Sequence, residues 1–182
     1  MLTAHEIRTM VHSRGMQARL VIDPWNPEQL NPNSYDLTLS PIIKIYDETQ
    51  GVLDVRKEMM VREGEIPDHG LVLEPNELYL GCSNEYTESH GLVPMINGKS
   101  SLARLGISVH QTGGFGDIDF YGHWTLEITV VKPVRVYPNM RIAQLCWFLP
   151  VGFINMRYKG KYQNSKSAAP IQSRSFEDWK DE

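Results

Sequence analysis

The feature that most constrains the fold is a series of short apolar segments, interrupted every few residues by Pro, Gly or Asn. In the first segment, SYDLTL, apolar and polar residues alternate, so that Tyr35, Leu37 and Leu39 share a face, which is typical of a β-strand with one buried face. Short strands with frequent turns indicate a mainly β barrel or sandwich and not an α/β layer. The segments are SYDLTL, IIKIY, LVLEP, ELYLGC, GLVPMI, WTLEITVV, VRVYP and IAQLCWFLP, and ISVHQT alternates in the same way.

One helix is expected, at the N-terminus. Thr3 and Glu6 fit a capping box, and Ile7 and Met10 then fall on one helical face. With Gly15 as a stop, the helix covers roughly residues 3–13 of an N-terminal segment 1–15. The following VIDPWNPEQLNPN is rich in Pro and Asn, which predicts an irregular loop.

The 182 residues are expected to form a single domain, 1–182, large enough to bury a core. A net charge of −4 argues against general nucleic-acid binding. No apolar run approaches the roughly 18 residues that span a bilayer, and no signal-peptide pattern is visible. We therefore expect a cytoplasmic protein that binds neither membrane nor nucleic acid. Cys82 and Cys146 form no CxxC pair, and both are expected to be buried free thiols.

From Tyr158 onward, residues 158–182 are polar with scattered aromatic side chains. This composition fits a frayed C-terminal tail. It also fits a tail that orders over a ligand, since Tyr158, Tyr162, Phe176 and Trp179 would anchor it. The sequence leaves both interpretations open.

Residues 98–127 contain the side chains that are best suited to binding a ligand or to catalysis. At one end, Lys99, Ser100, Ser101 and Arg104 offer charges and hydroxyls that suit phosphate oxygens. The P-loop spacing is absent, so a surface turn with ordinary charges is the alternative.

The middle of this stretch, GGFGDIDFYG, predicts a tight turn. Asp117 is placed to accept a hydrogen bond from a sugar hydroxyl, to activate a water or to help hold a magnesium-bound phosphate. Phe120 or Tyr121 would pack on a deoxyribose. The alternative is a hairpin whose aspartates only make turn hydrogen bonds.

At the far end, Glu127 lies in an apolar strand. Alternation puts it on one face with Thr125 and Thr129, opposite Trp124 and Leu126. If that face lines a closed pocket, desolvation raises the pKa of the glutamate towards neutrality and suits it to carry a proton; otherwise it faces solvent. The histidines show no metal-ligand spacing, and the HxE and PCxxC elements of zinc deaminases are missing.

In order, these segments resemble the dCTP deaminase family, relatives of the trimeric dUTPases. The matching blocks are LNPNSYDLTL, GKSSLARLGI, HQTGGFGDIDFYGHWTLE and MRIAQLCWF, with KYQ and SRS in the tail. The resemblance implies a distorted β-barrel or jelly roll of the dUTPase-like β-clip type. It also implies a short N-terminal helix and a C-terminal tail that closes over the site.

The resemblance further implies zinc-independent hydrolysis of dCTP to dUTP and ammonia. Glu127 matches the proton shuttle, Ser100 and the Gly113 carbonyl match the groups that hold the attacking water, and Arg104 supports the site. Magnesium would arrive with the triphosphate and not through a protein ligand cluster. The chain would form a homotrimer with sites at subunit interfaces, and dTTP is a candidate feedback inhibitor. The implied nucleotide contacts are Lys99, Ser100, Ser101, Leu102, Ala103, Arg104, Asp117, Thr125, Leu126, Glu127, Gln144, Tyr158, Lys161 and Tyr162.

Several positions depart from the family pattern. Lys99 stands where the family carries Arg, and Gly113 where it carries Ala. Ile118 and Asp119 replace the usual Pro-Gly and give the turn a dUTPase-like signature. Gly114 favours members that continue from dUTP to dUMP and diphosphate. A dUTPase that does not deaminate, and a catalytically silent nucleotide-binding regulator of the same fold, remain as alternatives.

Overall fold

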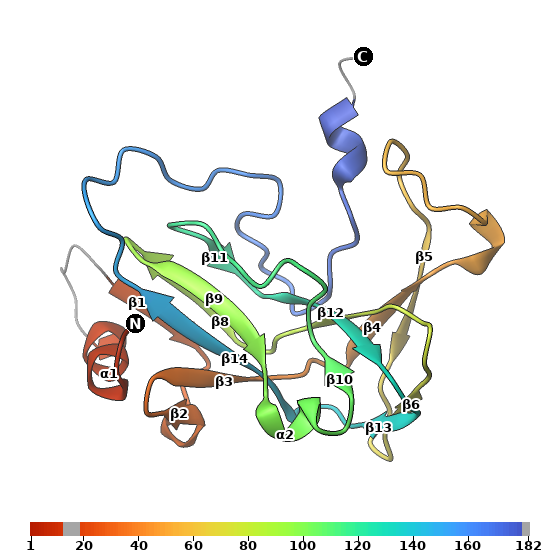
Figure 1. Cartoon of the computed structure of the whole chain (residues 1–182), viewed down its shortest axis with the longest axis horizontal. Helices are drawn as coiled ribbons and strands as arrows, with labels where there is room; N and C mark the ends of the chain where they lie inside the picture. The colour runs from red at the N-terminus through yellow and green to blue at the C-terminus, as the bar shows by residue number, and fades with distance from the viewer. Residues whose placement is uncertain (13–18, 180–182) are drawn as a thin grey trace.

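The protein is described by a computed structural model that covers residues 1–12 and 19–179 (Figure 1). Its helices are α1 (Ala4–His12) and α2 (Ser100–Ala103), with 3₁₀ turns η1 (Pro27–Gln29), η2 (Glu48–Gln50) and η3 (Ser175–Trp179). The strands are β1 (Arg19–Asp23), β2 (Leu30–Asn31), β3 (Ser34–Thr38), β4 (Ile42–Tyr46), β5 (Val61–Glu65), β6 (Leu71–Leu73), β7 (Tyr79–Cys82), β8 (Tyr86–His90), β9 (Val93–Gly98), β10 (Ile107–Ser108), β11 (Tyr121–Gly122), β12 (Thr125–Val130), β13 (Val134–Val136) and β14 (Arg141–Phe148).

These strands form distorted antiparallel sheets, so the mainly β fold expected from the sequence is confirmed. The sheet orders are β10-β12-β7-β4-β5, β2-β3-β14-β9, β1-β8-β11 and β13-β6. β14 lies between β3 and β9 and runs through the middle of the molecule (Figure 1). Among the described residues the sheets stay separate and do not close into one barrel.

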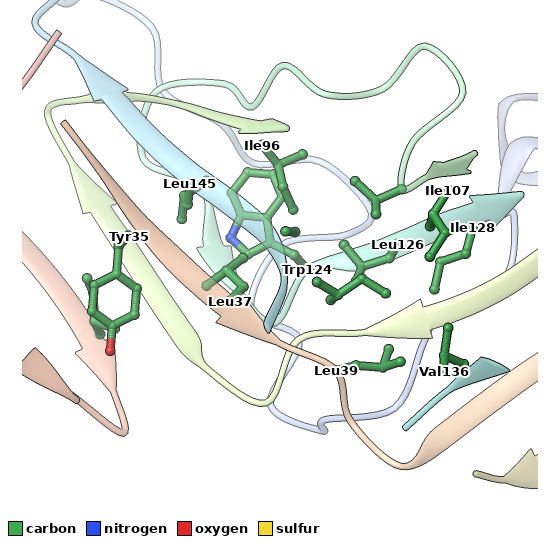
Figure 2. Close-up of a cluster of buried hydrophobic side chains, with 14 of the residues drawn as sticks. Tyr35, Leu37, Leu39, Ile96, Ile107, Trp124, Leu126, Ile128, Val136 and Leu145 are labelled. Atoms are coloured by element: carbon green, nitrogen blue, oxygen red, sulfur yellow. The ribbon is translucent and has the colours of Figure 1, made fainter. Parts of the chain in front are cut away.

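The inward faces of the strands build one apolar core. Tyr35 and Leu37 on β3, and Leu39 just after its end, are fully buried, as their alternation predicts. On β12, Leu126 and Ile128 are also fully buried, and Figure 2 shows them near Ile107 and Val136. Full burial of one such side chain contributes about 1.5–3 kcal/mol. The opposite face of β12 is thereby turned away from the core.

The N-terminal helix forms where the capping pattern places it. The Thr3 hydroxyl accepts a hydrogen bond from the Glu6 amide at 3.4 Å, and α1 buries Ile7 and Met10. The expected stop at Gly15 lies outside the described residues.

The strand pattern failed where inward-facing residues are polar. β8 was not predicted, because its buried residues are Thr87 and Ser89. Their hydroxyls accept hydrogen bonds from the indole nitrogens of Trp124 and Trp147, each at 2.9 Å, which satisfies these polar groups inside the core.

Three further expectations need correction. The predicted loop beginning at Val21 starts inside β1, which pairs with β8 and so takes residues 21–23 into a sheet. The solvent-facing β5 was also missed. The alternating segment ISVHQT is a strand only over β10, because its later residues turn towards the functional site.

Both cysteines are free, as expected. Cys82 is buried, and burial raises the pKa of its thiol to about 12. Cys146, on the outer side of β14, is only partly buried and not fully buried as expected. Its thiol donates a hydrogen bond to the Met95 carbonyl at 3.5 Å. In the part of the chain that the structure describes, no helix is long and apolar enough to cross a membrane.

Candidate functional site

A cavity of about 550 Å³ lies between β12, the turn that precedes β11, and the C-terminal tail. Its size suits a small organic ligand. Six of the predicted site residues line it: Gly113, Asp117, Thr125, Glu127, Tyr158 and Tyr162.

Glu127 presents its carboxylate to this cavity from the outer face of β12. The backbone amide of Gln111 donates a hydrogen bond to Glu127 Oε2 at 2.9 Å, which fixes the carboxylate. A Cβ added to Gly113 would lie 3.5 Å from Glu127 Oε1, so the glycine backbone borders the other oxygen. The acid and the Gly113 backbone therefore meet at one point of the wall.

Two glycines of the turn, Gly114 and Gly116, are required by its close approach to β9 and the core. A Cβ on Gly114 would lie 2.8 Å from the Ile96 carbonyl oxygen, too close for any real side chain. The Ile96 amide donates to the Gly114 carbonyl at 2.7 Å, and the Gly116 amide donates to Pro94 at 2.9 Å. β9 thus holds the turn, and with it Gly113 and Asp117, in place beside Glu127.

The two aspartates of the turn have separate roles. Asp117 lines the cavity. Asp119 is buried, accepts a hydrogen bond from the Gly91 amide at 2.6 Å and forms an ion pair with Arg157. Asp119 therefore fixes the structure around the turn, and only Asp117 is positioned to meet a ligand. Of the two aromatic candidates, Phe120 lines the cavity.

The tail passes over the cavity. The Ile171 amide donates to the Thr125 hydroxyl and the Ser173 amide donates to the Tyr46 hydroxyl, each at 3.0 Å. Further along, the Tyr162 hydroxyl accepts from the Arg174 amide at 3.0 Å. The tail in this structure is ordered against the site, as the second interpretation of its composition requires.

Lys161 is not part of the cavity wall. Its Nζ lies 2.6 Å from Asp178 in η3, and this pairing raises the pKa of the lysine. Its predicted contact with the nucleotide therefore requires the ammonium to leave Asp178.

The phosphate-type residues lie elsewhere on the chain. None of residues 99–104 lines the cavity, although all of them are described. Ser100, Ser101 and Arg104 are exposed on and beside α2, at the lower edge of the view in Figure 1. The remaining predicted contacts on this segment are Leu102, which packs against the core, and Ala103, which is exposed.

Three other predicted contacts also lie outside the cavity wall. Leu126 points its side chain into the core, so only its backbone is near the site. Lys99 and Gln144 both donate to the buried Asp36, with donor–acceptor distances of 2.7 and 3.2 Å. One chain thus holds two separate groups of candidate residues.

Sequence reasoning missed several residues of the cavity wall. Tyr46 lies at the end of β4, and His123 lies between β11 and β12. Neither belongs to a sequence motif. Ile171, Gln172 and Ser173 belong to the tail, and two of them contribute backbone amides, which leave no sequence signal. Gln111 also acts on Glu127 through its amide.

No group of three or more His, Cys, Asp or Glu side chains that could hold a metal ion occurs among residues 1–12 and 19–179. The carboxylates in the cavity wall are Asp117 and Glu127. Two carboxylates do not make up the set of roughly six or more oxygen ligands with which a protein cages a calcium or magnesium ion.

Comparison with known proteins assigns most of the chain to one family. Residues 1–149 match the family model described as dCTP deaminase-like. The chain belongs to this family. It is 46% identical over 151 residues to a protein of Clostridium acetobutylicum named dCTP deaminase, dUMP-forming, covering 83% of this chain and 86% of the relative. A Leptospira biflexa protein of the same name is 47% identical over 149 residues, covering 82% and 84%.

One solved structure has the same fold as this chain. The 2'-deoxycytidine 5'-triphosphate deaminase of Agrobacterium tumefaciens superposes with a TM-score of 0.57 at 21% identity. The match covers 80% of this chain and 47% of that longer chain. At this identity the likeness concerns the fold, and the expected dUTPase-like deaminase fold is confirmed.

Proposed function

We propose that this family member hydrolyses dCTP to dUTP and ammonia, and then dUTP to dUMP and diphosphate. The observation that carries the proposal is the Glu127 carboxylate, fixed beside Gly113 and Thr125 in a cavity under the tail. The relatives named dCTP deaminase, dUMP-forming support the same substrate and product.

In the proposed reaction, Glu127 takes a proton from a water that attacks C4 of cytosine. It delivers that proton to N3, and a second transfer lets the C4 amino group leave as ammonia. The Gly113 backbone borders the carboxylate, and its carbonyl would hold the water by accepting a hydrogen bond from it. A group that both accepts and returns a proton contributes about 10²–10⁴-fold to such reactions.

The cavity wall gives the nucleoside a direction. Thr125 and Glu127 would face the base, while Asp117 and Phe120 would face the deoxyribose. Tyr158 and Tyr162 of the tail close the outer side. Magnesium would be bound by the triphosphate oxygens and water, where it neutralises charge on the leaving diphosphate.

The exposure of α2 supports a shared site. Ser100 and Arg104 have the chemistry that the site needs, yet they lie outside their own chain's cavity. Leu105 and Val131 beside them leave 58% and 74% of their surface exposed, which suits a subunit contact. We propose a cytoplasmic homotrimer in which α2 of one copy completes the cavity of the next.

A dUTPase that does not deaminate is less well supported. Hydrolysis of the triphosphate requires no carboxylate directed at C4, whereas Glu127 lies in the wall where the base would sit. Gly114, which the packing against Ile96 requires, matches the dUMP-forming pattern.

The products decide between these activities. Purified protein is incubated with magnesium and dCTP, then separately with dUTP, and the nucleotides are resolved by chromatography with an ammonia assay. The proposal predicts dUMP and ammonia in equal amounts from dCTP. Turnover of dUTP alone would identify a dUTPase, and binding of dCTP without turnover would identify a regulator.

A further inference from the structure

A buried carboxylate organises the polar residues near α2. Asp36 on β3 is 1% exposed. Its Oδ1 accepts from Lys99 Nζ at 2.7 Å, from Asn31 Nδ2 at 2.9 Å and from Gln144 Nε2 at 3.2 Å. Arg141 NH1 lies 3.6 Å from Oδ2. Three hydrogen bonds thus meet at Oδ1, and the carboxylate brings the two cations Lys99 and Arg141 close together.

The two cations differ in how tightly Asp36 engages them. The Lys99 side chain is 19% exposed and makes the short contact. The Arg141 side chain is 43% exposed and makes the long one, and among the described residues its guanidinium forms no other ion pair. One carboxylate cannot neutralise both cations, so Arg141 keeps positive charge and most of its five N–H donors available.

The strand register places Arg141 near the start of α2, which contains Ser100 and Ser101. β14 and β9 are antiparallel and pair Ala143 with Gly98, after which the chain enters Lys99 and α2. Arg141 comes two residues before Ala143 and therefore lies beyond the last pair with β9, on the side where the chain leads into α2. In Figure 1 the start of β14 lies beside α2.

We propose that Arg141 is a phosphate-binding residue, which grips the polyphosphate of the nucleotide together with Ser100 and Ser101. Arginine suits this task because its planar guanidinium binds two phosphate oxygens at once. Asp36 is the positioning residue: it accepts hydrogen bonds from Lys99 and Gln144 and lies at ion-pair distance from Arg141. The identity of the polyphosphate rests on the proposed function.

Calorimetric titration with inorganic tripolyphosphate tests this binding site without any need for turnover. Arg141→Gln should weaken binding about tenfold, since a charge-assisted hydrogen bond is lost, and Arg141→Lys should recover part of it. Arg8→Gln, which removes an exposed arginine from α1, should bind as the wild type does. Wild-type affinity in Arg141→Gln, or no binding by the wild type, would overturn the proposal.

Kinetics with dCTP separates this inference from the proposed function. In Arg141→Gln the KM for dCTP should rise by a factor similar to the loss of tripolyphosphate binding, with kcat within about twofold of the wild type. A fall in kcat at unchanged KM would contradict a phosphate contact. If the wild type binds tripolyphosphate through Arg141 but does not convert dCTP, the phosphate site stands and the proposed reaction fails.

Discussion

At the scale of single residues, Glu127 is the side chain on which the proposed chemistry depends. Glu127→Gln keeps the shape and the hydrogen bond from the Gln111 amide, but it cannot exchange a proton. Ammonia release from dCTP should fall by at least about 10²-fold. Stopped assays of ammonia, with thermal unfolding and molecular mass as checks of the fold and assembly, measure this effect.

The matched control is Glu65→Gln, which alters an exposed glutamate on β5. It should leave both rate and stability near wild type, since surface changes usually stay within about 0.5 kcal/mol. Normal deamination by Glu127→Gln would show that another group moves the proton.

At the scale of elements, the turn that carries Gly113 to Asp119 is held by β9. Gly114→Ala would push a methyl group to within 2.8 Å of the Ile96 carbonyl, so the turn must shift. We expect a loss of about 1–3 kcal/mol in the free energy of unfolding, as for other overpacked sites. Urea denaturation of the two proteins measures it.

Gly113→Ala is the neighbouring control for stability. Its new methyl group would meet Glu127 Oε1 at 3.5 Å, which is ordinary van der Waals contact. Its free energy of unfolding should change by less than about 0.5 kcal/mol. Equal losses in the two variants would mean that the contact with β9 does not fix the turn.

The elements also show what the sequence could reveal. β3 and β12 were predictable because their buried faces are apolar and alternate, down to Leu37 and Leu126. β8 was not, because its inward Thr87 and Ser89 are paired with indoles about 40 to 60 residues away in the chain. A local hydrophobic pattern contains no trace of such distant hydrogen bonds.

The site was predictable to a similar extent. The spacing from Gly113 to Glu127 identifies the turn and the strand that meet in the cavity. It does not reveal that α2, which ends ten residues before Gly113, lies outside that cavity. Nor does it reveal the tail amides of Ile171 and Ser173, since any residue type can supply a backbone donor. These features arise only when the whole chain is folded.

At the scale of the whole molecule, the separation of α2 from the cavity is the basis for the proposed assembly of several copies. Each proposed site combines Glu127 of one chain with Ser100 and Arg104 of another. Cyclic assembly of identical chains allows every copy to give one half and receive the other. Two variants that damage different halves should therefore rescue one another.

The most direct test is to mix Glu127→Gln with Arg104→Ala. Each variant alone should be nearly inactive on dCTP. When the two are coexpressed or refolded together at equal amounts, random assembly leaves about one quarter of the sites with both halves intact. We predict dUMP formation at about that fraction of the wild-type rate. A mixture no more active than the average of the two variants would contradict the shared site.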